Sequence, residues 1–129
     1  MRITDPNTIV RAALTEKQFQ SQVMSLAKVF GWRAYHPYLS IHSERGFPDL
    51  TLVRERIVFA ELKTEKGRLT EHQEEWLGLL GSAGAEVYVW RPSDFDALTE
   101  ILRHRPKQAV SGEAADQVEG LMGAKGGSP

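Results

Sequence analysis

The chain has 129 residues, of which 41% are apolar and 26% charged, and its net charge of −1 provides no global positive field to attract nucleic acid. The lack of cysteine excludes a disulfide scaffold, a thiol nucleophile and a cysteine-rich zinc site. No apolar run approaches the roughly 18 residues of a membrane span, so we expect a soluble, cytoplasmic protein without a membrane partner.

Residues 15–31 are predicted to form the first long helix. A capping-box pattern begins at Thr15, apolar residues then recur at helical spacing, and Gly31 is the expected stop. Residues 1–14, which precede this helix, are interpreted as an N-terminal arm.

Three β-rich runs follow, at residues 32–36, 50–53 and 57–62. A long polar loop, 37–48, separates the first two runs, and the short turn 54–56 joins the last two, although it lacks the usual Gly or Asn. Three strands in succession predict an antiparallel meander.

A second capping box at Thr70 opens a helix that is expected to end near Gly84. A strand at 86–90 and a helix at 92–102 complete the pattern, and the helix before the last strand permits a right-handed parallel crossover. The predicted fold is therefore α/β: one domain, residues 15–105, with a mixed central sheet flanked by helices.

Residues 106–129 differ from the rest of the chain because they contain five glycines and few large apolar side chains. Such a segment cannot bury enough apolar surface to offset the entropy of ordering it. We therefore expect a disordered C-terminal tail. Its two basic and three acidic residues leave a neutral domain in front of it.

Asp49, Glu61 and Lys63 carry the most informative pattern. Glu61 and Lys63 are two residues apart on a predicted strand and therefore share one face. Asp49 and Glu61 are symmetric about the turn, so pairing of the strands would set them opposite each other. Two carboxylates suit Mg²⁺ or Mn²⁺, and a neighbouring lysine can orient or deprotonate an attacking water. The alternative is an exposed salt bridge on an edge hairpin, which contributes little.

Two helical residues give weaker signals. Glu16 shares the apolar face of its helix and so points inward, although a first-turn carboxylate is also favoured by the helix dipole. Gln73 lies on the face of Trp76, where an apolar residue is expected, although its position in the capping box explains it equally well.

Contacts with nucleic acid would have to come from local charge. The segment 54–68 is locally basic. The phosphate-contact candidates lie in the two loops near the carboxylates, with solvated surface charge as the alternative reading for each; they are His42, Arg45, Lys66 and Arg68. The aromatic residues Trp32, Tyr35 and Tyr38 can stack on unpaired bases, but packing in the core or at an interface is the favoured interpretation.

Taken together, these motifs resemble the VRR-NUC family, the virus-type replication-repair branch of the PD-(D/E)XK nuclease superfamily. The resemblance spans residues 15–102 and rests on Glu16, Gly46-Phe47-Pro48-Asp49-Leu50, Glu61-Leu62-Lys63, Gly67-Arg68-Leu69 and Gln73. It implies an αβββαβ core and a metal-dependent phosphodiesterase that acts on DNA.

The resemblance also implies a role for each site residue. Asp49 and Glu61 would bind Mg²⁺, or Mn²⁺ in its place, with the backbone carbonyl of Leu62 as a third ligand. Lys63 would be the catalytic lysine. Glu16 would bind the metal directly or through water, and Gln73 would position Lys63 or the attacking water.

The stand-alone members that this chain resembles imply a homodimeric nuclease for branched or junction DNA, working in phage or bacterial replication and repair. A helicase or another replication protein is the implied partner, and the cytoplasm of a bacterial or phage-infected cell is the implied location. A sequence-specific restriction-type nuclease would need a recognition appendage, for which 129 residues leave little room. A non-catalytic DNA-binding module would be expected to lose Asp49, Glu61 or Lys63, and all three are present.

Overall fold

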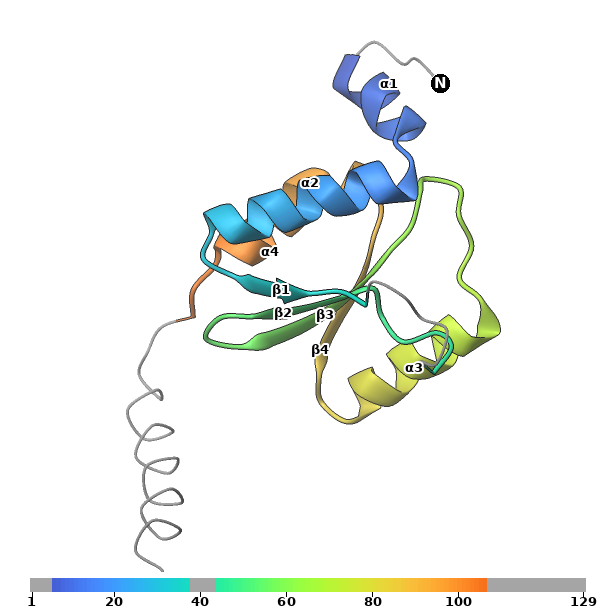
Figure 1. The fold of residues 1–129 in the computed structure, drawn as a ribbon, viewed down its shortest axis with the longest axis vertical. Helices are drawn as coiled ribbons and strands as arrows, with labels where there is room; N and C mark the ends of the chain where they lie inside the picture. The colour runs from blue at the N-terminus through green and yellow to red at the C-terminus, as the bar shows by residue number, and fades with distance from the viewer. Residues whose placement is uncertain (1–5, 38–43, 107–129) are drawn as a thin grey trace, which may run out of the picture.

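The sheet at the centre of the molecule has four strands in the order β1-β2-β3-β4 (Figure 1). The structure is a computed structural model that describes residues 6–37 and 44–106. The strands are β1 (Arg33–Tyr35), β2 (Leu50–Val53), β3 (Ile57–Leu62) and β4 (Glu86–Trp90). The first three pair antiparallel and β4 runs parallel to β3, which confirms the predicted mixed sheet.

Helices cover both faces of the sheet, as predicted. The helical elements are α1 (Pro6–Ala13), α2 (Glu16–Val29), α3 (Glu71–Ser82), the 3-10 turn η1 (Pro92–Asp94) and α4 (Phe95–Arg103). Helices α2 and α4 lie over one face, whereas α3 lies against the other (Figure 1). Both predicted capping boxes are present, at Thr15 and at Thr70, and they determine where α2 and α3 begin. No described helix is long and apolar enough to cross a membrane.

The core lies between the sheet and the helices α2 and α4. Leu52 and Val58, which face each other across β2 and β3, are fully buried. Phe19 and Val23 from α2 and Leu98 from α4 are also fully buried against this face. Val58, Ala60 and Leu62 of β3 point into this core. Because side chains alternate along a strand, Glu61 is directed to the other face, with Phe59.

Helix α1 was not predicted, because residues 1–14 were read as an arm. Its Ile9 and Val10 are both exposed. Arg11 ties the helix to the start of α4. It pairs with Asp96 at 3.3 Å, and its guanidinium carbon lies 5.6 Å from the ring centre of Phe95. The predicted disordered tail lies outside the described residues beyond Pro106 and stays a prediction.

Arg54, in the β2–β3 turn, fastens the hairpin to the helix ends. Its guanidinium donates hydrogen bonds to the carbonyl oxygens of Phe30 at 2.9 Å and Leu102 at 2.8 Å, and to that of His104 at 2.6 Å. These carbonyls lie at the C-terminal ends of α2 and α4, where backbone acceptors lack helical partners. The turn is therefore held by side chains rather than by a glycine-type turn residue.

Arg56 works beside Arg54. It donates to the carbonyl oxygen of Ile101 and to the carboxylate of Glu86, at 2.9 and 2.8 Å. Both guanidinium groups stack on the ring of Trp32, which is 4% exposed and donates its indole N–H to the helix end. The interpretation that Trp32 packs in the core is therefore confirmed. Within the locally basic segment 54–68, these two arginines therefore hold the fold together.

Candidate active site

Asp49 and Glu61 interlock at the open end of the hairpin. The pairing of Leu50 with Ala60 sets Asp49 opposite Glu61, as the symmetry about the turn predicts. The backbone N–H of Asp49 donates to Glu61 Oε1 at 3.1 Å, and the N–H of Leu62 donates to Asp49 Oδ2 at 2.9 Å. Each carboxylate thus accepts a hydrogen bond from the opposite side of the hairpin. The predicted convergence of the two carboxylates is confirmed.

Glu61 is a buried carboxylate with an unsatisfied oxygen. Its side chain is 1% exposed, and Oε2 has no hydrogen-bond partner among residues 6–37 and 44–106. Burial, followed by the neighbouring carboxyl of Asp49, raises the pKa of Glu61 to about 8, and the charge of Lys63 offsets part of this rise. A buried, unpartnered carboxylate oxygen is costly unless a cation neutralises it.

The donor set at this position fits a hard divalent cation. The carboxylates of Asp49 and Glu61, with the adjacent carbonyl of Leu62, are the oxygen ligands that Mg²⁺ and Mn²⁺ prefer. Within 6–37 and 44–106, no three acidic or histidine side chains are grouped so that they could hold an ion together. In proteins, Mg²⁺ usually keeps several waters and is bound by one or two carboxylates.

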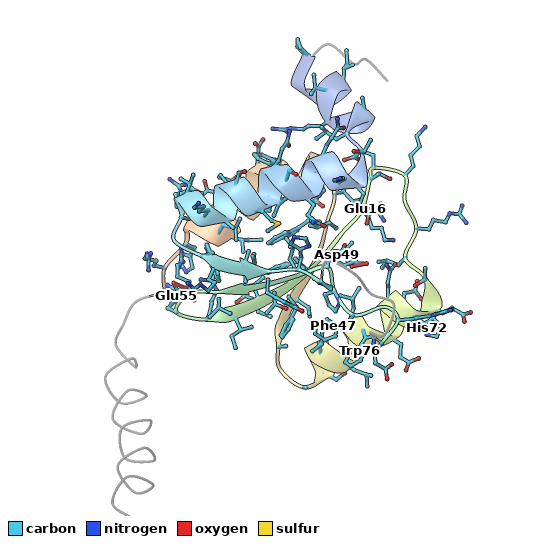
Figure 2. The ribbon with its side chains drawn as sticks, in the orientation of Figure 1. Glu16, Phe47, Asp49, Glu55, His72 and Trp76 are labelled. Atoms are coloured by element: carbon cyan, nitrogen blue, oxygen red, sulfur yellow. The ribbon has the colours of Figure 1, made fainter. Side chains whose placement is uncertain are left out.

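Lys63 and Glu16 border the carboxylate pair. Lys63 directly follows β3 and is 9% exposed, and its N–H donates to the carbonyl of Trp90 at 3.0 Å, so pairing continues past the end of the strand. Glu16 is the first residue of α2 and remains exposed. Burial and the charge of Asp49 raise the pKa of the Glu16 carboxyl, and Lys63 lowers it. Figure 2 shows Glu16 on the α2 side of Asp49.

Gln73 caps the start of α3, as the alternative interpretation of this residue predicts. Its Oε1 accepts the N–H of Thr70 at 2.9 Å, and its own N–H donates to the hydroxyl of Thr70 at 3.2 Å. The residue also lines the groove that contains Asp49. Among the described residues no hydrogen bond joins Gln73 to Lys63, so its positioning role stays a prediction.

Arg91 is a positioning residue that sequence reasoning missed. One of its guanidinium nitrogens, NH1, donates to the carbonyl oxygens of Thr64 and Gly67, both at 2.6 Å, and reaches that of Glu65 at 3.3 Å. It thereby holds the loop that follows Lys63. No local pattern could reveal this, because Arg91 lies 24 residues beyond Gly67 in the sequence. An arginine directly after the last strand is the only available signal.

The predicted phosphate contacts fall into two loops. Lys66 and Arg68 are exposed, and neither takes part in an ion pair within the described part of the chain. Arg45 is exposed and lines the groove beside Asp49. His42 lies outside the described residues, as does Tyr38.

Gly46 explains why the motif around Asp49 begins with glycine. Its φ is +89°, a conformation that side chains rarely adopt, and a Cβ there would lie 2.3 Å from the carbonyl carbon of His72. The loop backbone therefore packs directly on the first turn of α3. This contact places Pro48 and Asp49 next to the end of β3, and Pro48 is fully buried there.

The element order and the mixed sheet are those predicted for a nuclease domain of the VRR-NUC type. The model of the VRR-NUC domain matches residues 11–94, and the chain belongs to this family. A solved structure described as a VRR_NUC domain protein matches with a TM-score of 0.58 and 20% identity, covering 76% of this chain and 89% of that one. At this identity the likeness supports the fold alone. No curated protein matches the chain. Family membership implies a nuclease domain with DNA as its substrate.

Proposed function

We propose that this protein is a metal-dependent DNA endonuclease that hydrolyses phosphodiester bonds with Mg²⁺, or with Mn²⁺ in its place. The observation that carries the proposal is the buried Glu61 Oε2, which has no hydrogen-bond partner in the described part of the chain although Asp49 and Lys63 lie beside it. A fold that maintains an uncompensated carboxylate at this position gains from a bound cation.

Each residue then has a defined task. When bound, a divalent ion lowers the pKa of water and offsets negative charge on the phosphate. Asp49 and Glu61 would hold the ion, with the carbonyl of Leu62 beside them. Lys63 would orient the attacking water or stabilise charge that develops at phosphorus. Glu16, which stays exposed, would act through a water molecule.

The proposal extends to the choice of substrate. The described elements are those of the nuclease core together with α1, so a separate domain for reading sequence is not found in 6–37 or 44–106. We propose branched or junction DNA, rather than a restriction-type target, as the substrate. A homodimer would supply two sites for symmetrical cuts, and C₂ dimers are common. Phage or bacterial replication and repair, with a helicase or similar partner, is the proposed setting.

The activity is tested by nicking of supercoiled and branched DNA with Mg²⁺, Mn²⁺ or EDTA. We expect cleavage only with the metals, and a loss of about 10²- to 10⁴-fold for Asp49→Asn and for Lys63→Ala. Asp96→Asn and Lys28→Ala, on the exposed surfaces of α4 and α2, are matched controls that should cleave normally. If Asp49→Asn cleaves as fast as the unmodified protein, the site assignment is wrong.

The substrate class needs a separate measurement. Labelled four-way junctions, flaps, forks and nicked duplexes of common sequence are compared, with molar mass determined in parallel. Preference for a branched substrate by a dimer is the expected result. A monomer that cuts every substrate equally would contradict the junction proposal, and a consensus sequence at the cut ends would favour the restriction-type alternative.

A further inference from the structure

A groove of about 740 Å³ opens directly beside Asp49, and its walls are rich in aromatic rings. We call it the aromatic groove; the three rings that define it are Tyr35, Phe47 and Trp76. They come from the edge strand β1, from the loop before β2 and from α3. Figure 2 shows Phe47 and Trp76 together near α3, on the side of Asp49 away from Glu16.

The rings lie at the surface of the groove rather than in the core. Phe47 is 38% exposed, yet it makes edge-to-face contacts with Trp76 and Phe59, at centroid distances of 5.0 and 5.9 Å. Tyr35 is 68% exposed at the last position of β1. Because Gly46 fixes the loop against α3, the position of Phe47 is determined by packing on two sides. The groove therefore has an aromatic surface whose position is fixed by packing.

The charge of the groove favours a ligand with a flat ring. Arg45 lines it together with two acidic residues, Glu44 and Asp49, so the lining is not suited to bind a phosphate alone. Aromatic faces stack on nucleobases regardless of sequence. A base inside a duplex has both faces covered by its neighbours, whereas an unpaired base does not.

We propose that the aromatic groove binds an unpaired nucleobase of the DNA, adjacent to the phosphodiester bond that is cut. This inference rests on the proposed nuclease function and specifies its substrate: DNA with unpaired nucleotides next to the cleavage position. Tyr35 is the main stacking residue because it is the most exposed of the three rings. Arg45, at the same groove, contacts the flanking phosphate.

Binding is measured on the full chain in EDTA, so that cleavage does not contribute. The probes are a fluorescein-labelled duplex with a five-nucleotide thymidine flap and the same duplex without the flap. We expect the flap probe to bind more tightly. Tyr35→Ala should weaken flap binding roughly tenfold and leave duplex binding unchanged, whereas Tyr35→Phe should restore it. Leu79→Ala, an exposed apolar residue of α3 outside the groove, is the matched control.

A base analogue gives a second readout. With 2-aminopurine at the first flap position, stacking on the groove should quench its fluorescence, and Tyr35→Ala should abolish the quenching. The inference is overturned if Tyr35→Ala binds both probes like the unmodified chain, or weakens both equally. It is also overturned if Tyr35→Ala converts a dimer into a monomer in sedimentation, because the groove would then bind a second copy.

Cleavage of the same probes with Mg²⁺ separates this inference from the proposed function. A chain that binds the flap through Tyr35 but cuts neither probe contradicts the nuclease proposal and supports the groove. A chain that cuts both probes equally, and for which Tyr35→Ala changes nothing, contradicts only the groove.

Discussion

The two ends of the β2–β3 hairpin both bury ionisable side chains, but these side chains are fully paired only at the turn. At the turn, the guanidinium groups of Arg54 and Arg56 meet backbone carbonyls, carboxylates and the face of Trp32. At the open end, Glu61 is buried with one oxygen that accepts no hydrogen bond from any residue that the structure describes. Figure 2 shows this separation, with Glu55 at one end and Asp49 at the other. Charge that is paired stabilises the fold, whereas a buried carboxyl group with an unpaired oxygen favours the binding of a cation in exchange for its proton.

The largest effect on stability should come from the turn. Arg54→Ala removes hydrogen bonds to three carbonyls and the stacking on Trp32, and it should destabilise the protein by about 3 kcal/mol. Cleavage per folded molecule at low temperature should not change. Urea unfolding and nicking assays on the same preparation measure the two effects. Loss of cleavage without loss of stability would contradict the division between the two ends.

A smaller effect, of opposite sign, is expected from Glu61→Gln in metal-free protein. The ordinary pKa of this carboxyl is 4.5 and the folded protein raises it to about 8, so the folded state keeps a proton that the unfolded state has lost. The stability from Glu61 is complete below pH 4.5 and disappears as the pH rises to about 8. At pH 8, Glu61→Gln should therefore be more stable than the unmodified protein, by roughly 2 kcal/mol.

Thermal unfolding at pH 5 and pH 8, with and without Mg²⁺, measures this difference. At pH 5 the two proteins should be close in stability. Added Mg²⁺ should stabilise the unmodified protein and not Glu61→Gln, because the ion stabilises only a chain that binds it. A stability gain for Glu61→Gln that is the same at both pH values would show that the buried charge of Glu61 is not its cause.

Arg91 tests whether the loop after Lys63 must be held for catalysis. Arg91→Ala should lower kcat roughly tenfold and change KM less, because the loop next to Lys63 loses its attachment. Arg91→Lys should restore most of kcat, since a single nitrogen of Arg91 reaches all three carbonyls. Steady-state kinetics on one branched substrate measure both. A purely structural role would lower stability in Arg91→Ala without the change in kcat.

The smallest expected effect concerns the loop charges. Lys66→Ala and Arg68→Ala should each weaken DNA binding by a similar factor for all sequences and reduce the salt slope of affinity by about 1. Anisotropy titrations at several salt concentrations measure the slope. Lys28→Ala, an exposed lysine of α2, is the control and should leave the slope unchanged. An unchanged slope in Lys66→Ala would remove this residue from the phosphate contacts.

Much of the site could be predicted because its residues are local in sequence. The pairing of Asp49 with Glu61 follows from hairpin symmetry, and the capping boxes at Thr15 and Thr70 follow from four-residue patterns. Arg91 could not be found in this way, because its partners are carbonyl groups that any residue type provides. Helix α1, which Arg11 ties to the fold, was also missed.

The sequence by itself determined the order of the elements, the mixed sheet and the alignment of Asp49, Glu61 and Lys63, since periodicity and capping are encoded in neighbouring residues. The tertiary structure decided which charges are compensated. Arg54 and Glu61 look equally ordinary in a strand-turn-strand pattern, but helix ends meet only one of them. Burial and pairing depend on segments distant in the chain, so they appear only after the chain has folded.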